Sequence, residues 1–369
     1  MCHIGNDAAR LALVAEARVA AKAILGSCFR VPVHKAMDLR DPRGFDRAVA
    51  QLATQLRSKA SGPEDAAVRA AVSALDVDWP RTTAEQRRAL ISGALRAAGR
   101  EIAAVPGAVR VTFGGAADQV VRAGREAARK TQRLTIGADF NALDRRIVSY
   151  LRASQSVFVR GEYGRRAEAF TAEAKRIVSD GLEAGLGRQD IGRDLARAAS
   201  GTLGGQAGPY WEVVAGSFIG QGRSFAQLSA FAEAGLERYR FEAVLDEHTT
   251  ETCRFLHGQV FTVSTGLQRF EEVEAEPDRM KDILPWVRES FDRETGRKSL
   301  YVDQAGLRTV IAEVTRSAVG TRDDRGEFSR GLSDRDLADL GVSFPPLHGL
   351  CRSSVRGACR KRFLDFPSS

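Results

Sequence analysis

The chain has 369 residues, of which 43% are hydrophobic and 28% are charged, and its formal net charge is +8. These values exclude wholesale disorder and are typical of globular protein, with enough chain for two domains. Five cysteines, an odd number, argue against a secreted disulfide framework, so we expect folding in a reducing compartment. The positive charge suits a polyanion such as DNA, but ordinary surface charge explains it equally well.

An apolar segment close to the N-terminus, residues 7–25, predicts an amphipathic helix. Four charged side chains interrupt it: Arg10, Glu16, Arg18 and Lys22. We therefore expect neither a signal peptide nor a membrane-spanning helix here.

Most of the chain up to residue 235 predicts helices, because apolar residues recur at spacings of three and four and turn residues separate the segments. The expected helices cover 44–59, 63–75, 83–98, 116–133, 141–159, 162–185, 189–199 and 209–235. A turn at Gly62-Pro63 separates the first two, and a short strand is expected at Ala108–Thr112 between two glycine-containing turns.

A glycine-rich segment at 200–208 predicts a linker. We therefore expect a mainly helical region over residues 1–205 and a second module over 206–369. The fold class expected for the whole chain is α+β, with a long helical N-terminal region followed by a small α+β module that has short antiparallel strands.

Alternating apolar residues predict three strands in the second module. They lie at Tyr239–Leu245, at Val260–Val263 after a turn at Gly258, and at Ser353–Arg356. Between them we expect a helix at Asp303–Val314 and a loop at Arg316–Arg335.

Four arginines in the helix that starts near Ala116 are spaced three, four and four residues apart, which places them along one stripe. They are Arg122, Arg125, Arg129 and Arg133. Such a stripe could contact DNA phosphates or an acidic portal surface. The alternative is a solvated face that pairs with acidic neighbours such as Glu126.

Thiol and imidazole groups are concentrated in two segments of the last third of the chain. Cys253 and His257 lie in the first segment, and His348 and Cys351 lie in the second. Because structural zinc prefers four thiolate or imidazole ligands, these residues form a candidate zinc site, with Asp246 as an alternative to His257. The alternatives are buried thiols that act as small hydrophobic groups, with His348 as a hydrogen-bonded turn residue, or a disulfide.

The same two segments resemble the signature of the phage Mu F-like head morphogenesis family, the minor head proteins of tailed phages and prophages. The patterns Asp-x6-Cys-x2-Leu-x-Gly-x2-Phe and Pro-Pro-Leu-His-x2-Cys-Arg fall on Asp246, Cys253, Leu256, Gly258 and Phe261, and on Pro345, Pro346, Leu347, His348, Cys351 and Arg352. Family members commonly have Cys after the motif arginine and Asp before the motif glycine, where this chain has Ser353 and His257. His257 could replace a lost ligand, and Cys359 could restore one.

The resemblance covers residues 238–357 and implies a structural role without catalysis. It implies assembly in the bacterial cytoplasm and a place inside the virion head, with the portal protein and other head proteins as partners. The resemblance also implies packaged double-stranded DNA as a partner, and it implies no contact with a membrane. The alternative is a metal-dependent enzyme or effector that uses Asp246, His248 and His348. We also expect Arg352 to form an ion pair with Asp246.

Overall fold

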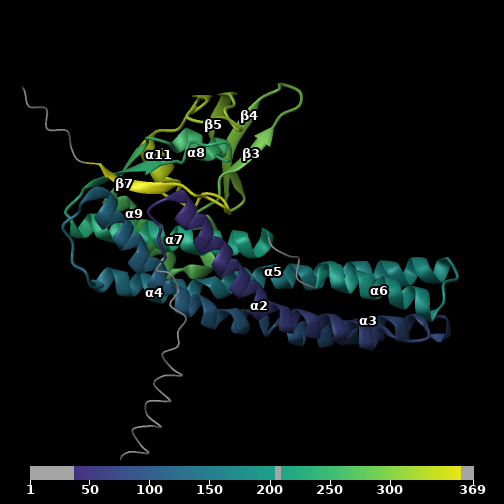
Figure 1. Cartoon of the computed structure of the whole chain (residues 1–369). Coiled ribbons are helices and arrows are strands. Elements are labelled where there is room, and N and C mark those ends of the chain that lie inside the picture. The colour runs from purple at the N-terminus through teal and green to yellow at the C-terminus, as the bar shows by residue number, and fades with distance from the viewer. Residues whose placement is uncertain (1–36, 204–208, 359–369) are drawn as a thin grey trace, which may run out of the picture. The chain divides into compact units, whose positions relative to one another are not determined.

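The computed structural model describes residues 37–203 and 209–358. The fold class is α+β, as predicted: long helices come first and two small antiparallel sheets follow (Figure 1). The helices of the first part are α2 (Pro42–Leu75), α3 (Ala84–Ile102), α4 (Val105–Gln132), α5 (Ala142–Glu183), α6 (Arg188–Thr202) and α7 (Pro209–Glu233). The shorter helices that follow are α8 (Glu251–Leu256), α9 (Val263–Ala275), α10 (Met280–Ile283) and α11 (Asp334–Asp339).

Helix α7 lies at the centre of the described fold. It contacts α2, α4 and α5, and it also contacts α9 and the last strand (Figure 1). Most of its side chains are apolar and they are buried on every side of the helix, which is the pattern of a helix enclosed by its neighbours. A Cβ added to Gly222 would lie 2.5 Å from Val120 on α4 and 2.9 Å from Leu151 on α5, so glycine allows these three helices to approach closely.

Capping side chains define where several helices begin. Thr83 and Gln86 form a reciprocal capping box at the start of α3, which begins where the sequence predicts a helix. Asn141 and Asp144 form another at the start of α5.

A three-stranded sheet has the order β2–β1–β7. Its strands are β1 (Arg238–Glu242), β2 (Val260–Thr262) and β7 (Ser354–Ala358), and both pairings are antiparallel. The three strands expected from the sequence are thus present within a few residues of their expected bounds. The first motif segment follows β1, and the second leads into β7. Because β7 pairs with β1, the two motif segments lie close together.

A second sheet has the order β3–β4–β5–β6. Its strands are β3 (Arg288–Phe291), β4 (Lys298–Gln304), β5 (Leu307–Arg316) and β6 (Glu327–Ser329). The helix expected at Asp303–Val314 is wrong, because this segment forms the β4–β5 hairpin. Ala305 and Gly306 have φ angles of 48° and 83°, and two consecutive positive φ values make the tight turn that joins twisted strands.

The loop expected at Arg316–Arg335 is also partly wrong, because β6 and the start of α11 lie within it. Asp334 and Asp336 stand in the first turn of α11, where carboxylates are favoured, and Ser333 caps the helix.

Three expectations about the helices are wrong. The turn at Gly62-Pro63 does not form, because α2 continues through Pro63 with buried alanines on both sides of it. The helices expected at 141–159 and 162–185 are one helix, α5. The strand expected at Ala108–Thr112 lies inside α4, where Val105, Val109 and Phe113 are buried at four-residue spacing. In each case packing outweighs the local preference of Pro or Gly.

The linker expected at 200–208 is only partly described. Residues up to Thr202 belong to α6, while 204–208 lie outside the described residues, as does the helix expected at 7–25. From Asp38 onward the described residues belong to one compact unit, in which α7 packs on the helices that precede it. None of the helices within 37–203 and 209–358 combines the length and apolarity needed to cross a bilayer.

Candidate metal centre

The first motif segment presents its cysteine from the short helix α8. Thr250 caps this helix and accepts a hydrogen bond from the backbone N–H of Cys253. The helix is buried throughout, with Leu256 fully enclosed. Gly258 follows with a φ of +90°, and its N–H donates to the carbonyl of Phe241 on β1. This turn returns the chain to β2, where Phe261 stacks on Tyr239.

The second motif segment is a tight turn that enters the same region. Pro345 and Pro346 are joined by a cis peptide bond, and Leu347 is buried beyond them. The N–H of Cys351 donates to the carbonyl of His348, 3.3 Å away, so the two side chains lie on one turn.

Three candidate ligands meet where these segments join. Cys253 Sγ lies 3.2 Å from His348 Nε2 and 3.7 Å from Cys351 Sγ. The three ligand atoms are all within 4.8 Å of one another, and both thiols are buried. Two thiols and an imidazole at this spacing could hold a metal ion.

The pKa values of the two thiols are shifted in opposite directions. A hydrogen bond from Cys253 and the neighbouring His348 hold the pKa of Cys351 well below its usual range. The same hydrogen bond, together with burial, raises the pKa of Cys253. Burial opposes protonation of His348, but the charge of Cys351 outweighs it and raises the pKa of the imidazole. The group therefore favours a thiolate at Cys351, the form that binds metal.

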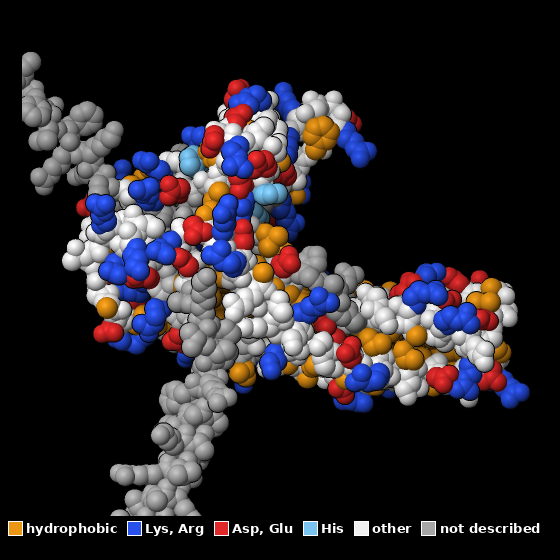
Figure 2. Space-filling model, viewed as in Figure 1, with side chains coloured by type: hydrophobic (Ala, Val, Ile, Leu, Met, Phe, Trp, Pro, Cys, Tyr) orange, Lys and Arg blue, Asp and Glu red, His pale blue; other side chains and the backbone are white. Residues whose placement is uncertain are grey.

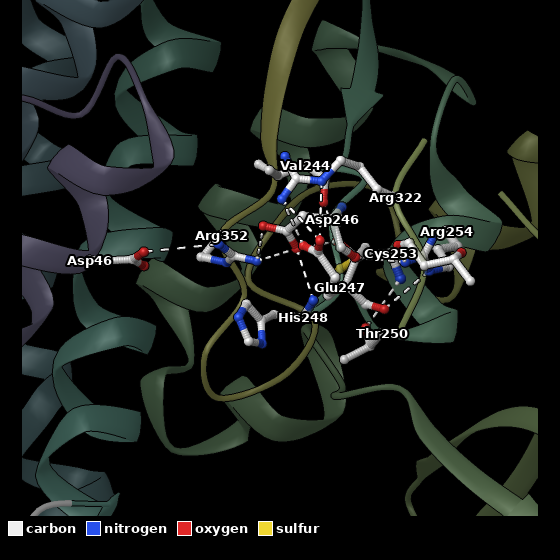
Figure 3. A network of polar contacts seen from close by, with 12 residues as sticks. Asp46, Val244, Asp246, Glu247, His248, Thr250, Cys253, Arg254, Arg322 and Arg352 are labelled. Atoms are coloured by element: carbon white, nitrogen blue, oxygen red, sulfur yellow. Dashed lines mark hydrogen bonds and ion pairs between the residues drawn. The ribbon is translucent and has the colours of Figure 1, made fainter. Parts of the chain in front are cut away.

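An ion pair lies beside the group. Arg352 Nη2 is 2.5 Å and 2.7 Å from the two carboxylate oxygens of Asp246, which confirms the predicted pairing. Figure 3 shows Arg352 between Asp246 and Asp46 on α2, whose carboxylate is 3.9 Å from Nη1. Burial opposes ionisation of Asp246, but hydrogen bonds from Arg352 and Thr249 outweigh it and lower its pKa. The second motif is thus tied to the first motif and to the helical region.

Two fully buried arginines support the motif segments, and neither forms an ion pair with a carboxylate of the described residues. Arg254 donates to the carbonyls of Asp246, Thr249, Thr321 and Asp324. Arg223 on α7 donates to the carbonyls of Arg352 and Ser353 and stacks on Phe45. Sequence analysis missed both residues. Arg223 carried one available signal, since it is a lone cation in the apolar sequence of α7.

The structure does not bring every predicted site residue into the group. His257 lies outside it, because its Nδ1 accepts a hydrogen bond from the N–H of Ala243. Asp246 is engaged by Arg352, and His248 is exposed. Cys359 lies outside the described residues. The group formed by described residues therefore consists of three ligands, Cys253, His348 and Cys351.

The expected row of four exposed arginines on α4 does not form. Arg125 is buried and pairs with Asp144 at 2.8 Å and Glu233 at 2.9 Å. The other three remain exposed: Arg129 pairs with Glu126, Arg122 lies over the ring of Phe140, and Arg133 ends the helix. The stripe fails because one of its positions faces the core.

Comparison of the chain with protein-family models, with curated proteins and with solved structures finds no match.

Proposed function

We propose that the chain is a minor head protein of a tailed phage or phage-like particle and that it acts in head assembly. In this role it works inside the head with the portal protein and other head proteins. One observation carries the proposal: the two segments that resemble the head morphogenesis signature meet in space, at the Cys253–His348–Cys351 group and the Arg352–Asp246 ion pair.

We propose further that zinc is the ion at this group and that its role is structural. Thiolate and imidazole are the donors that zinc prefers, and two cysteines with one histidine supply three of its four ligands. Because Cys253 lies on α8 and the other two ligands lie on the second motif, a bound ion would clip the two segments together.

The polar groups around the site favour this structural role over catalysis. A general base must be free to reach a substrate, whereas the Asp246 carboxylate is held by Arg352, Thr249 and the N–H of His248. The ligand atoms themselves lie among buried side chains. We therefore assign no catalytic residue.

The metal is tested by measuring zinc per chain on protein purified without a chelator. We expect about one zinc per chain in the native protein, and loss of that zinc in Cys351→Ser and Cys253→Ser. The same substitution at Cys28, which lies far from the two motifs in sequence, is the matched control and should keep the zinc. If the native protein contains no zinc, the proposed structural zinc site is refuted.

The assembly role is tested in the strain that encodes the chain. We expect the protein to sediment with purified particles and to resist protease until the heads are opened. Deletion of its gene should reduce the yield of infectious or DNA-filled particles. Normal particles from the deletion strain, or a protein that never enters particles, would refute the assembly role whatever the metal content.

A further inference from the structure

The outer face of the β2–β1–β7 sheet is rich in arginine. Alternate residues of β1 and β7, among them Tyr239, Phe241 and Val355, are buried beneath the sheet. The residues between them face outward, and those that carry positive charge are Arg238, Arg240 and Arg356, all exposed. Figure 2 shows Lys and Arg side chains over the part of the molecule where Figure 1 labels β7.

Two of these arginines stand directly opposite each other. Arg240 on β1 is the register partner of Arg356 on β7, so both guanidinium groups leave the same face at neighbouring positions. Like charges in this arrangement destabilise a sheet unless an anion lies between them. Arg356 reaches Glu242 at 3.6 Å, whereas Arg238 and Arg240 form no ion pair with the described residues.

A fourth arginine, from the segment between β5 and β6, lies beside the Gly258 turn that precedes β2. Arg325 is exposed, and its Nη1 would lie 3.7 Å from a Cβ added to Gly258. The pKa of the neighbouring His257 is lowered by burial and by the charge of Arg325; Arg240 adds to this lowering, while Glu242 opposes it. Two carboxylates lie nearby, Glu242 on the face and Asp334, which accepts from the N–H of Val260 at the sheet edge.

We propose that this face, made of Arg238, Arg240, Arg325 and Arg356, binds the phosphate backbone of double-stranded DNA. Guanidinium groups match phosphate oxygens, and a phosphate between Arg240 and Arg356 would relieve their repulsion.

The chemistry of the face favours duplex DNA over other anions of similar charge. The uncharged outward residues are Val260, Thr262, Ser354 and Ala358, so the face lacks the large apolar or aromatic anchors that a protein partner would use. It also lacks aromatic rings on which unpaired bases could stack, which argues against single strands.

This inference deepens the proposed function, because it names a surface through which a head protein would contact packaged DNA. It can nevertheless be tested without particles. If the protein binds DNA in solution but is absent from heads, the inference stands and the assembly role fails. If it enters heads but does not bind DNA, the assembly role stands and the inference fails.

The experiment measures binding of the purified full chain to a short DNA duplex of mixed sequence over a range of salt concentrations. We expect Arg240→Gln and Arg356→Gln each to weaken binding about threefold to tenfold at 0.1 M salt, and to lower the salt slope by about one. The matched control is Arg88→Gln on α3, which removes another exposed arginine that forms no ion pair with the described residues. It should change the affinity less than about twofold.

Thermal unfolding of the same variants separates binding from folding. Since Arg240→Gln removes a like-charge pair, the variant should unfold at the same temperature as the native chain or higher. Binding without salt dependence, or equal losses for Arg240→Gln and Arg88→Gln, would overturn the proposal. Tighter binding to a single strand than to the duplex would also overturn it.

Discussion

Buried arginines are stabilised differently in the two parts of the molecule. In the long helices, Arg125 pairs with the carboxylates of Asp144 and Glu233 and adds one bond to the carbonyl of Gly137, and Arg166 pairs with the carboxylates of Glu64 and Glu162. Around the motif segments, Arg254 and Arg223 bond to backbone carbonyls instead.

This difference follows from the backbone around each arginine. Helices satisfy their own carbonyls, so a buried arginine beside them needs a carboxylate from another side chain. The motif segments are mostly irregular and leave buried carbonyls unpaired, and the five N–H groups of an arginine can satisfy several of them. An arginine of this second kind therefore fixes the path of the chain, which is what a metal site built on loops requires.

The largest expected effect is at Arg254. Arg254→Met removes the donor to four carbonyls in a fully buried position, so we expect the free energy of unfolding to fall by about 5 kcal/mol. Urea unfolding measures this. No second substitution can restore the loss, because the unpaired acceptors are backbone atoms. A fall below about 1 kcal/mol would contradict the assigned role.

Removal of metal should have the next largest effect and should act on the motif segments first. A zinc site saturated at about 1,000 times its dissociation constant stabilises the folded chain by about 4 kcal/mol. We therefore expect a chelator to lower the unfolding temperature of the native chain but not that of Cys351→Ser. Hydrogen exchange should show faster opening at α8 and β7 than at α4. If metal removal speeds hydrogen exchange equally at α8, β7 and α4, the metal does not act locally on the motif segments.

Arg125→Met tests the other kind of buried arginine. It leaves the fully buried carboxylate of Asp144 without its cation, and we expect a loss of about 3 kcal/mol in urea unfolding. Here a second change should help: Arg125→Met with Asp144→Asn removes the unpaired charge and should recover much of the loss. If the double variant is no more stable than the single one, the ion pair is not the source of the effect.

The smallest expected effect is the pH dependence of the Asp246–Arg352 pair. Because the folded-state pKa of Asp246 is lowered, its contribution to stability is complete above the unfolded pKa of about 3.9 and is lost as the pH falls through the folded value. The difference in unfolding free energy between the native chain and Asp246→Asn should be about 1 kcal/mol at pH 7. It should shrink below pH ~4. If this difference in unfolding free energy grows as the pH falls, the lowered pKa assigned to Asp246 is contradicted.

Local signals in the sequence predicted the fold class, many helix positions and the three strands of the first sheet. The capping box at Thr83 and the C-terminal glycine at Gly235 are such signals. The sequence did not indicate the β4–β5 hairpin because its turn is Ala305-Gly306 rather than the Asn-Gly that marks such turns most clearly. Pro63 and Gly114 were read as breakers because the packing that keeps them helical is tertiary.

For the site, the sequence predicted Cys253, His348, Cys351 and the Asp246–Arg352 pair, since motif spacing carries that information. It could not predict that His257 turns toward the backbone of Ala243, because that depends on how the turn at Gly258 meets β1. Nor could it show that Arg125 faces the core. The spacing of residues along a helix tells which side chains share a face, but only tertiary packing decides whether that face is buried.

The separation of the ligands along the chain has a consequence for synthesis in the cell. Cys253 precedes Cys351 by 98 residues. At a translation rate of about 5–20 residues per second, the first thiol is synthesised roughly 5–20 s before the second. The Cys253–His348–Cys351 group is thus completed only after the helices that precede it have been made, and Cys253 must stay reduced throughout that interval.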